Sequence, residues 1–312
     1  MQKKALHEMR RLLLLLGGAI LLCGCVRDNR DDCLFPLRLQ FSYNYNREQQ
    51  DLFAAEVGQV QLFLYDARSG VLRDSAVART AELEPDNIFT WNVPPGAYYV
   101  VAWGGEGRRY RPTSCDKLSQ GRMSVVARDD RTGVDHAPEH LWHRIGHDMT
   151  VTGDRQAPYP MDLHKFSNDV RVEVTGLPAE SLADLSCTIS ASNGCYDFDG
   201  NSRSDEGRCV WLPEFSRQED RAVHDFTVLR LLPGDDSHLH VEVLPGSGGR
   251  GVSGVIYDGS LSELLMANPG VDLDLDDEFT VRLESQLRPD GNFSVSIYVN
   301  DWHVVDMNGG LG

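Results

Sequence analysis

The chain has 312 residues, of which 41% are hydrophobic, 8% aromatic and 25% charged. This composition excludes collagen, a coiled coil and wholesale disorder, and the length suggests two domains. The 47 acidic and 30 basic residues give a net charge of −17, which argues against a general nucleic-acid-binding protein because such a surface repels phosphate.

The first 24 residues have the pattern of a secretory signal peptide. Basic residues precede an unbroken run of small and apolar residues, Leu12 to Leu22. This run is shorter than the roughly 18–20 residues of a membrane-spanning helix, but it suits the hydrophobic region of a signal. Leu22-Cys23-Gly24-Cys25 resembles a bacterial lipobox, which implies cleavage before Cys25 and attachment of lipid to that cysteine. An ordinary secretory signal with chance cysteines is the alternative.

Residues 25–33 are expected to form a short lipidated tether, with charged side chains from Arg27 to Asp32. Acyl chains contribute about 0.8 kcal/mol per buried methylene, so several of them hold a protein on a membrane without a transmembrane helix. Acidic residues directly after the cysteine resemble the surface-export signals of Bacteroidetes lipoproteins, with a solvated linker as the alternative. The sequence therefore predicts a protein that is lipid-anchored in the cell outer membrane and exposed at the surface.

Beyond the tether, apolar residues recur at every second position, which places them on one face of a β-strand. Polar residues between them predict antiparallel strands with one wet face. Turns rich in glycine, proline and aspartate separate the strands, as in β-sandwiches. The predicted strands include Leu37–Tyr45, Val60–Leu64, Tyr98–Ala102, Val170–Val174, Leu239–Val243 and Phe293–Val299.

Helical patterns are sparse. Residues 51–57 predict two turns, and residues 260–267 begin with a serine cap that is followed three positions later by a glutamate. Proline, glycine and charged residues at 153–160 indicate a domain boundary. The prediction is an N-terminal β-sandwich domain over 34–156 and a C-terminal β-sandwich domain over 157–312.

Five cysteines remain beyond Cys25, an odd number that cannot all pair within one chain. Three of them are close enough in sequence to pair locally, and the pairing of the whole set stays open. A zinc site is less favoured because no C-x2-C pair occurs. The five are Cys33, Cys115 and the local group Cys187, Cys195 and Cys209.

Seven segments carry a family likeness when they are taken in chain order. They are Cys33–Asn44, Val60–Asp66, Val93–Gly105, Leu141–His143, Leu163–Val172, Asn193–Asp199 and Val299–Val305. Together with the lipobox, they resemble the FimB-like fimbrial subunit and anchor proteins of Bacteroidales. The chain departs from that family at Trp142-His143-Arg144, where Phe-His-Gly is usual, and around Lys165–Ser167.

The resemblance implies an all-β chain with two transthyretin-like β-sandwich domains in tandem after a lipoprotein signal peptide. It also implies an outer-membrane lipoprotein that anchors or forms part of a fimbria and joins fimbrial shaft or accessory subunits by edge-strand exchange. Main-chain hydrogen bonds strengthen such contacts, and alternate side chains fill pockets. The alternative is a surface lipoprotein that binds carbohydrate or a host ligand through exposed aromatics. Four tryptophans could line such a face, although burial inside the sandwiches is the simpler expectation for them: Trp91, Trp103, Trp211 and Trp302.

A run of histidines is the strongest rival chemistry, because spacings of four, three and four would place them on one face of a helix and suit a transition metal. Pro138 and Gly146 interrupt such a helix. Surface histidines that flank a buried Leu141, Trp142 and Ile145 are therefore favoured, and no metal site is assigned. The run comprises His136, His140, His143 and His147.

Other candidate sites are weaker. Asp197–Asn201 superficially resembles a calcium loop, but Ser202 stands where glycine is needed and Arg208 where glutamate is needed, so a turn is predicted. Carboxylates over 272–278 alternate with apolar residues, which predicts an extended segment with a solvated acidic side. No G-x-S-x-G or H-E-x-x-H motif occurs. The sequence predicts neither an enzyme nor a cofactor, and Cys25 alone is assigned a role, as the lipid anchor.

Overall fold

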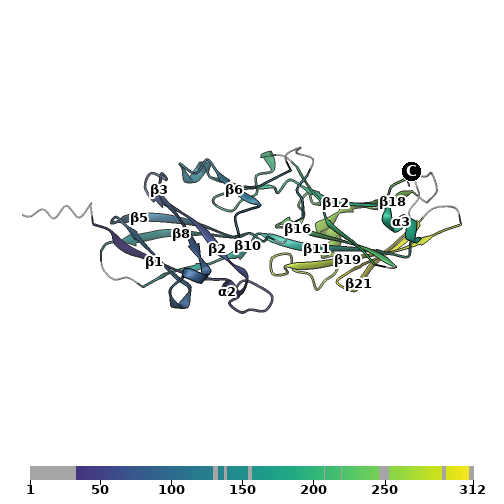
Figure 1. Cartoon of the computed structure of the whole chain (residues 1–312), viewed down its shortest axis with the longest axis horizontal. Coiled ribbons are helices and arrows are strands. Elements are labelled where there is room, and N and C mark those ends of the chain that lie inside the picture. Colours follow the sequence, from purple (N-terminus) through teal and green to yellow (C-terminus); the bar gives the residue numbers. More distant parts are fainter. Residues whose placement is uncertain are drawn as a thin grey trace, which may run out of the picture.

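The computed structural model describes residues 33–128, 133–136, 139–153, 157–206, 208–218, 220–245, 253–289 and 293–308. The signal peptide and Cys25 lie outside these residues, as do residues 154–156 at the predicted domain boundary. The molecule is elongated and consists mostly of strands in several sheets, with few short helices (Figure 1). Among the described residues, no helix combines the length and hydropathy needed to cross a bilayer.

The N-terminal half contains two main sheets. Its strands are β1 (Phe35–Ser42), β2 (Gln59–Asp66), β3 (Leu72–Arg79), β4 (Ile88–Val93), β5 (Gly96–Gly104), β8 (Trp142–Val151), β9 (Tyr159–Asp162) and β10 (His164–Lys165). One sheet has the order β4-β1-β9, and the other has the order β10-β8-β5-β2-β3. The short helix α2 (Phe53–Glu56) confirms the position of the first predicted helix, but it has four residues, about one turn instead of the two predicted.

The C-terminal half also contains two main sheets. Its strands are β11 (Ser167–Thr175), β12 (Leu185–Ala191), β14 (Cys209–Trp211), β15 (Glu214–Arg217), β16 (Arg221–Leu229), β17 (His238–Val243), β18 (Gly254–Ser260), β19 (Glu278–Leu287), β20 (Phe293–Val299) and β21 (Trp302–Asn308). The orders are β15-β16-β11-β19-β20-β21 and β14-β12-β17-β18. The helices are α3 (Ala179–Ala183) and α4 (Leu261–Met266). The Ser260 side chain accepts a hydrogen bond from the Glu263 amide, as predicted for the start of α4.

A fifth, small sheet joins the two halves. It has the order β13-β7-β6, from β6 (Tyr110–Thr113), β7 (Arg122–Val125) and β13 (Cys195–Asp197). Strands β6 and β7 belong to the connection between β5 and β8, whereas β13 follows β12. The antiparallel pairing of β13 with β7 therefore links segments on either side of residue 156.

Strand direction corrects one prediction. The first strand of each half pairs antiparallel on one side and parallel on the other: β1 lies between β4 and β9, and β11 lies between β16 and β19. The alternating pattern predicted antiparallel strands throughout. Alternation fixes which face of a strand is buried, but it carries no information about the direction of the neighbouring strand.

The predicted apolar faces are buried. Leu37, Leu39 and Phe41 of β1 pack in one cluster with Leu62 of β2 and Val100 of β5, which lies between the two N-terminal sheets. In the C-terminal half, the inward rows of β11, β17 and β20 share a second cluster. Period-two alternation thus correctly assigned the inward face of these strands.

The other face of the five-stranded sheet corrects the prediction of a wet side. Phe63 and Tyr65 of β2 and Val101 and Trp103 of β5 are buried in the cluster that also forms the C-terminal core. These four residues alternate with the predicted inward positions. They are apolar because this sheet is covered on both faces. A strand buried on both sides has a nearly continuous apolar sequence, as Val60–Tyr65 does.

Candidate functional site

Several of the segments that resemble fimbrial proteins in sequence meet at the junction between the two halves. The Trp103 ring lies 4.2 Å from the ring of His143, and His143 lies 5.1 Å from Phe166. Phe198, which follows β13, packs against Phe63 with ring centroids 5.0 Å apart. Aromatic pairs at such distances contribute energy beyond the area they bury. The junction is therefore a packed aromatic cluster.

His143 lies inside this cluster, which corrects its prediction as a surface residue. Its Nε2 atom is 3.1 Å from the Phe198 carbonyl oxygen, and its side chain is buried. Burial lowers the pKa of His143 to about 4, so the imidazole is neutral at pH 7. The neutral ring places its Nε2 proton toward this carbonyl, which leaves Nδ1 as the acceptor.

The remaining histidines of the run are dispersed because residues 142–151 form strand β8 and not a helix. His140 contacts Ser167 through Nδ1, His147 packs edge-on against Tyr99, and His136 Nε2 is 3.5 Å from Glu214. Within the described ranges, no three His, Cys, Asp or Glu side chains are grouped to hold a metal ion. Helical spacing was the wrong period for this segment.

Two buried amides fix the backbone beside the junction. Asn168 Oδ1 accepts a hydrogen bond from the Leu231 amide, and its Nδ2 donates to the Asp276 carbonyl. Asn193 Nδ2 donates to the Leu229 carbonyl at 2.9 Å. Because an unsatisfied buried polar group is costly, these bonds help to determine one arrangement of the loops.

A largely buried lysine connects the halves on one side of the junction. Lys165 Nζ lies 3.4 Å from Asp277 and 3.9 Å from Glu56, and Tyr43 donates a hydrogen bond to Asp277. Burial, followed by the charge of Asp277, raises the pKa of the Tyr43 phenol. Glu56 and Tyr43 belong to the N-terminal half and Asp277 to the C-terminal half, so this network holds the two halves together.

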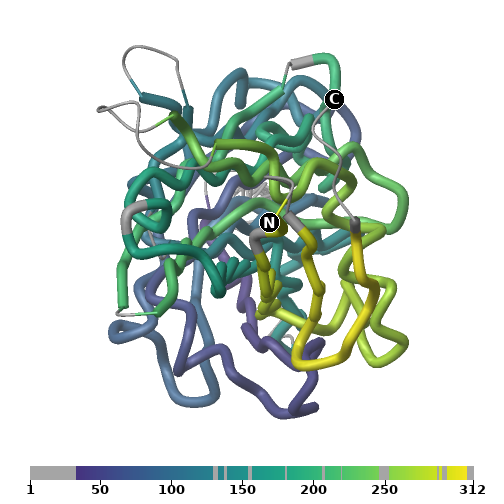
Figure 2. Tube along the Cα trace, turned by 90° about the vertical axis from the view of Figure 1, so that its right-hand side faces the viewer, coloured from purple at the N-terminus to yellow at the C-terminus, as the bar shows by residue number. Residues whose placement is uncertain are grey.

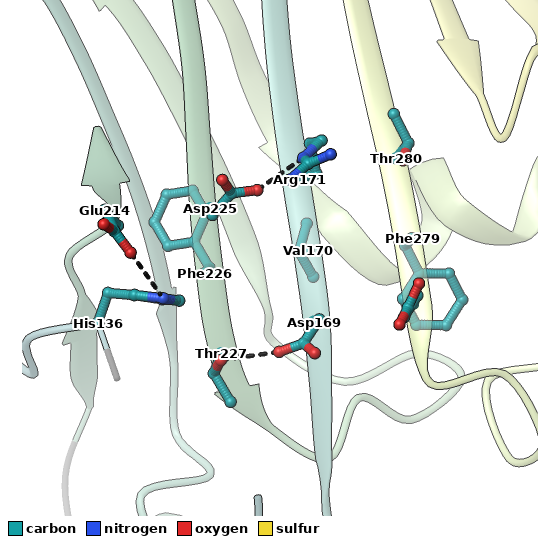
Figure 3. Close-up of a pocket in the computed structure, with 11 residues that line it drawn as sticks. His136, Asp169, Val170, Arg171, Glu214, Asp225, Phe226, Thr227, Phe279 and Thr280 are labelled. Atoms are coloured by element: carbon teal, nitrogen blue, oxygen red, sulfur yellow. Dashed lines mark hydrogen bonds and ion pairs between the residues drawn. The ribbon is translucent and has the colours of Figure 1, made fainter. Parts of the chain in front are cut away.

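A shallow pocket of about 340 Å³ lies on the outer face of the six-stranded sheet (Figure 3). Arg171 donates to Asp225 at 2.7 Å, and Thr227 donates to Asp169 at 2.7 Å. Figure 3 shows these pairs across β16 and β11, with His136 and Glu214 at the margin. Arg171, Asp225, Thr227 and Asp169 are thus engaged with one another in two pairs across neighbouring strands.

Two acidic segments form turns. Over 272–278 the amides of Leu275 and Asp276 bond to the Asp272 carbonyl, so the predicted extended conformation is wrong. Asp272 and Asp276 stabilise this turn through their own side chains. In the predicted turn at Asp197, the carboxylate accepts hydrogen bonds from the amides of residues 199 and 201. Local hydrogen bonding by aspartate outweighs the alternating pattern in the first segment.

The cysteines of the local group lie on different strands. Cys187 of β12 is buried opposite Val241, and Cys209 of β14 lies opposite Ala191. Cys195 accepts a hydrogen bond from Ser124 at 3.2 Å. Burial, followed by the nearby Cys195, raises the pKa of the Cys209 thiol. Cys195 and Cys209 are therefore close neighbours, whereas Cys187 lies further along β12.

The strand at each sheet edge is the other candidate site, because its outer backbone groups are available to a partner. The largest apolar side chain exposed on any of these edges is Trp302 of β21, and 53% of its surface is accessible. The other three candidate tryptophans are buried: Trp91, Trp103 and Trp211. The structure therefore does not bring the four together into a sugar-binding face.

Comparison with known proteins gives matches along almost the whole chain. A profile of the family described as fimbrillin-A associated anchor proteins Mfa1 and Mfa2 matches residues 30–308. The chain is 24% identical over 329 aligned residues to the minor fimbrium anchoring subunit Mfa2 of Porphyromonas gingivalis, and the alignment covers 97% of each protein.

Solved structures share the fold. The fimbrial anchor protein Mfa2 from Porphyromonas gingivalis superposes with a TM-score of 0.70 and 22% identity, covering 88% of this chain and 100% of that one. A candidate adhesin from Bacteroides ovatus gives a TM-score of 0.73 at 19% identity, covering 88% and 96%. The β-sheet arrangement is thus common to proteins whose sequences have diverged widely.

Proposed function

Because this chain belongs to the family of fimbrillin-A associated anchor proteins Mfa1 and Mfa2, we propose that it anchors a fimbria to the outer membrane of its cell. This membership confirms the resemblance found in the sequence. The family is structural and not enzymatic, and its anchoring role associates it with the cell surface. The observation that carries the proposal is the match over residues 30–308, which includes both halves of the molecule.

The proposed membrane attachment is a lipid on Cys25. The basic segment, the apolar run and the lipobox-like Leu22-Cys23-Gly24-Cys25 support it. The charged residues that follow would separate the folded body from the membrane, so that the sheets stand free for assembly. Several acyl chains would give a lasting attachment.

The proposed partners are fimbrial shaft or accessory subunits, joined by exchange of edge strands. We further propose that the halves are two transthyretin-like sandwiches. The division falls after Lys165 and not after residue 156, because β9 and β10 pair with strands of the N-terminal sheets. The repeated placement of the first strand supports this division, since β1 and β11 each lie between an antiparallel and a parallel neighbour. The exposed edge strands support the assembly mode.

The proposal is tested by Cys25→Ala, with Cys23→Ala as the matched control. Cys25→Ala is expected to abolish incorporation of labelled palmitate and to release both the protein and its fimbriae into the medium. Cys23→Ala is expected to leave them on the cells. Palmitate labelling and tight membrane association of the Cys25→Ala protein would contradict the lipid site. Fimbriae that stay attached when the whole chain is deleted would contradict the anchoring function.

A further inference from the structure

Strand β21 is a long edge strand whose backbone is hydrogen-bonded to a neighbouring strand on one side. It pairs antiparallel with β20 from Ser294↔Asn308 to Val299↔Trp302, and within the described residues it pairs with no other strand. The β20–β21 hairpin, in yellow, lies along the lower side of the C-terminal half in Figure 1 and on the side toward the viewer in Figure 2. The outer backbone N–H and C=O groups of such a strand are free to pair with an incoming strand.

An apolar row follows the core side of this edge. Trp302, Val305 and Met307 lie opposite Val299, Ile297 and Val295, which are all buried. Directly opposed residues of antiparallel strands share a face, so the β21 row points toward the core side of its sheet. Nevertheless, 53% of Trp302 and 41% of Val305 are accessible. The six-stranded sheet packs against a sheet of only four strands. The smaller sheet therefore leaves Trp302 and Val305 at the edge of the larger sheet uncovered.

The other long edges carry charges that discourage pairing. Strand β3 presents Arg73, Asp74 and Arg79 as exposed side chains. On β18, Asp258 lies 2.6 Å from His238 and 3.0 Å from His240 of the neighbouring strand. Edge strands of soluble proteins are commonly protected in this way. Strand β21 also carries an exposed charged pair, His303 and Asp306, and a register irregularity. It differs in exposing two apolar side chains on one face, Trp302 and Val305, where β3 and β18 each expose one valine.

The opposite face of β21 indicates the charge of the partner. Asp306 accepts a hydrogen bond from Ser296 and is 3.0 Å from His303. Asp301, at the turn into β21, is 89% accessible at its side chain and lies 3.1 Å from Arg282 of β19. A second copy of this chain would bring a second net charge of −17 to this edge, whose two exposed carboxylates lie beside Arg282 and His303. A strand with a basic residue on its outward face would complement the edge instead.

We propose that β21 is the edge to which a fimbrial subunit adds an extended strand, with apolar residues facing Trp302 and Val305 and a basic residue near Asp306. This inference rests on the proposed anchoring function. Main-chain hydrogen bonds to β21 provide the pairing, and burial of the apolar row provides the register. The incoming strand would lie as a seventh strand over the uncovered margin of the core.

The test measures binding of the purified full-length lipoprotein to fimbriae sheared from the cells that produce it. Trp302→Lys and Val305→Lys are compared with Val77→Lys on β3, where 46% of the valine is accessible. Each β21 variant is expected to weaken binding about tenfold or more, the size of a hot-spot loss. Val77→Lys is expected to bind like the unaltered chain. Thermal unfolding confirms that all three variants are folded.

Photo-crosslinking locates the contact directly. A benzoylphenylalanine at position 305 is expected to crosslink to a fimbrial subunit, whereas one at position 77 is not. Crosslinks from 305 to a second copy of the chain, or unaltered fimbrial binding by both β21 variants, would overturn the assignment to β21 while leaving anchoring intact. Failure of the unaltered lipoprotein to bind fimbriae would instead count against the proposed function itself.

Discussion

The junction between the halves and the β21 edge place aromatic residues in opposite environments. At the junction, Trp103 and Phe198 are at most 1% accessible and contact rings from both halves. On β21, Trp302 is half exposed and contributes to an apolar row with a free backbone edge. Both regions lie in segments that resemble fimbrial proteins. The difference indicates that the junction aromatics stabilise the molecule, whereas those on the edge are available for recognition.

Removal of the central junction ring is expected to have the largest effect. Phe198→Ala deletes a side chain that packs against Phe63 and Tyr65 and leaves a cavity. The free energy of unfolding should fall by about 3–5 kcal/mol, measured by urea denaturation. The matched control is Phe215→Ala on β15, because 46% of this phenylalanine is accessible. Equal losses in the two variants would remove the distinction between junction and edge.

The second-largest effect is expected from acidification, which should lower the free energy of unfolding through two buried histidines. Burial lowers the pKa of His143 and of His224 to about 4, below the value of about 6.5 in an unfolded chain. Between these values the unfolded state binds more protons than the folded state, so stability falls as the pH falls. The expected loss is about 2 kcal/mol per histidine from pH 7 to pH 5.

The contribution of His143 is separated by His143→Gln, followed by denaturation across the same pH range. The variant should show a shallower pH dependence than the unaltered chain. The exposed Phe215 serves as the control, because Phe215→Ala removes no titratable group and is expected to leave the slope unchanged in this range. A slope that is the same in all three proteins would show that His143 does not titrate on unfolding.

A pair of glycines tests how closely the junction is packed. Both have positive φ, but a Cβ at Gly200 would lie 2.9 Å from the His143 ring, whereas one at Gly234 would meet nothing within 4 Å. Each alanine variant therefore has the same backbone strain, about 1 kcal/mol. Gly200→Ala should cost about 1 kcal/mol more because of overpacking. Equal unfolding midpoints would mean that the ring moves aside freely.

The smallest stability effect is expected at the β21 edge. Val305→Lys replaces an exposed side chain and should change the free energy of unfolding by no more than about 0.5 kcal/mol. Calorimetry of the variant and of Val77→Lys provides the measurement. A loss comparable to that of Phe198→Ala would show that Val305 stabilises the fold, and it would weaken the distinction between the two regions.

The period-two pattern predicted the strands and their inward faces because burial alone selects alternate residues. It did not predict that β9 runs parallel to β1 or that Phe63 and Trp103 are also covered. Both depend on partners that are distant in sequence, and for the second feature the continuous apolar run of β2 was the available signal. The acidic turn at Asp272 was missed for a local reason, since aspartate side chains bonded to nearby amides.

The sequence predicted less of the candidate site than of the fold. The resemblance identified segments that the structure brings together, including Trp103, His143 and Phe198, but it did not reveal that they form a junction. His143 is predicted to be a surface residue that flanks buried apolar neighbours, whereas its ring is neutral and packs between Trp103 and Phe166. Trp302 was grouped with three buried tryptophans, since composition carries no information on exposure. The role of Cys25 stays a prediction.

Strand β13 and the residues after it have a consequence for the order in which the protein can mature. A chain that emerges with its N-terminus first produces Phe63, Tyr65 and Trp103 long before Phe198, the ring that covers them. Until then, one face of the five-stranded sheet is an open apolar surface, of the kind that promotes aggregation in incomplete chains. During export this face is the surface that a holding chaperone would have to shield.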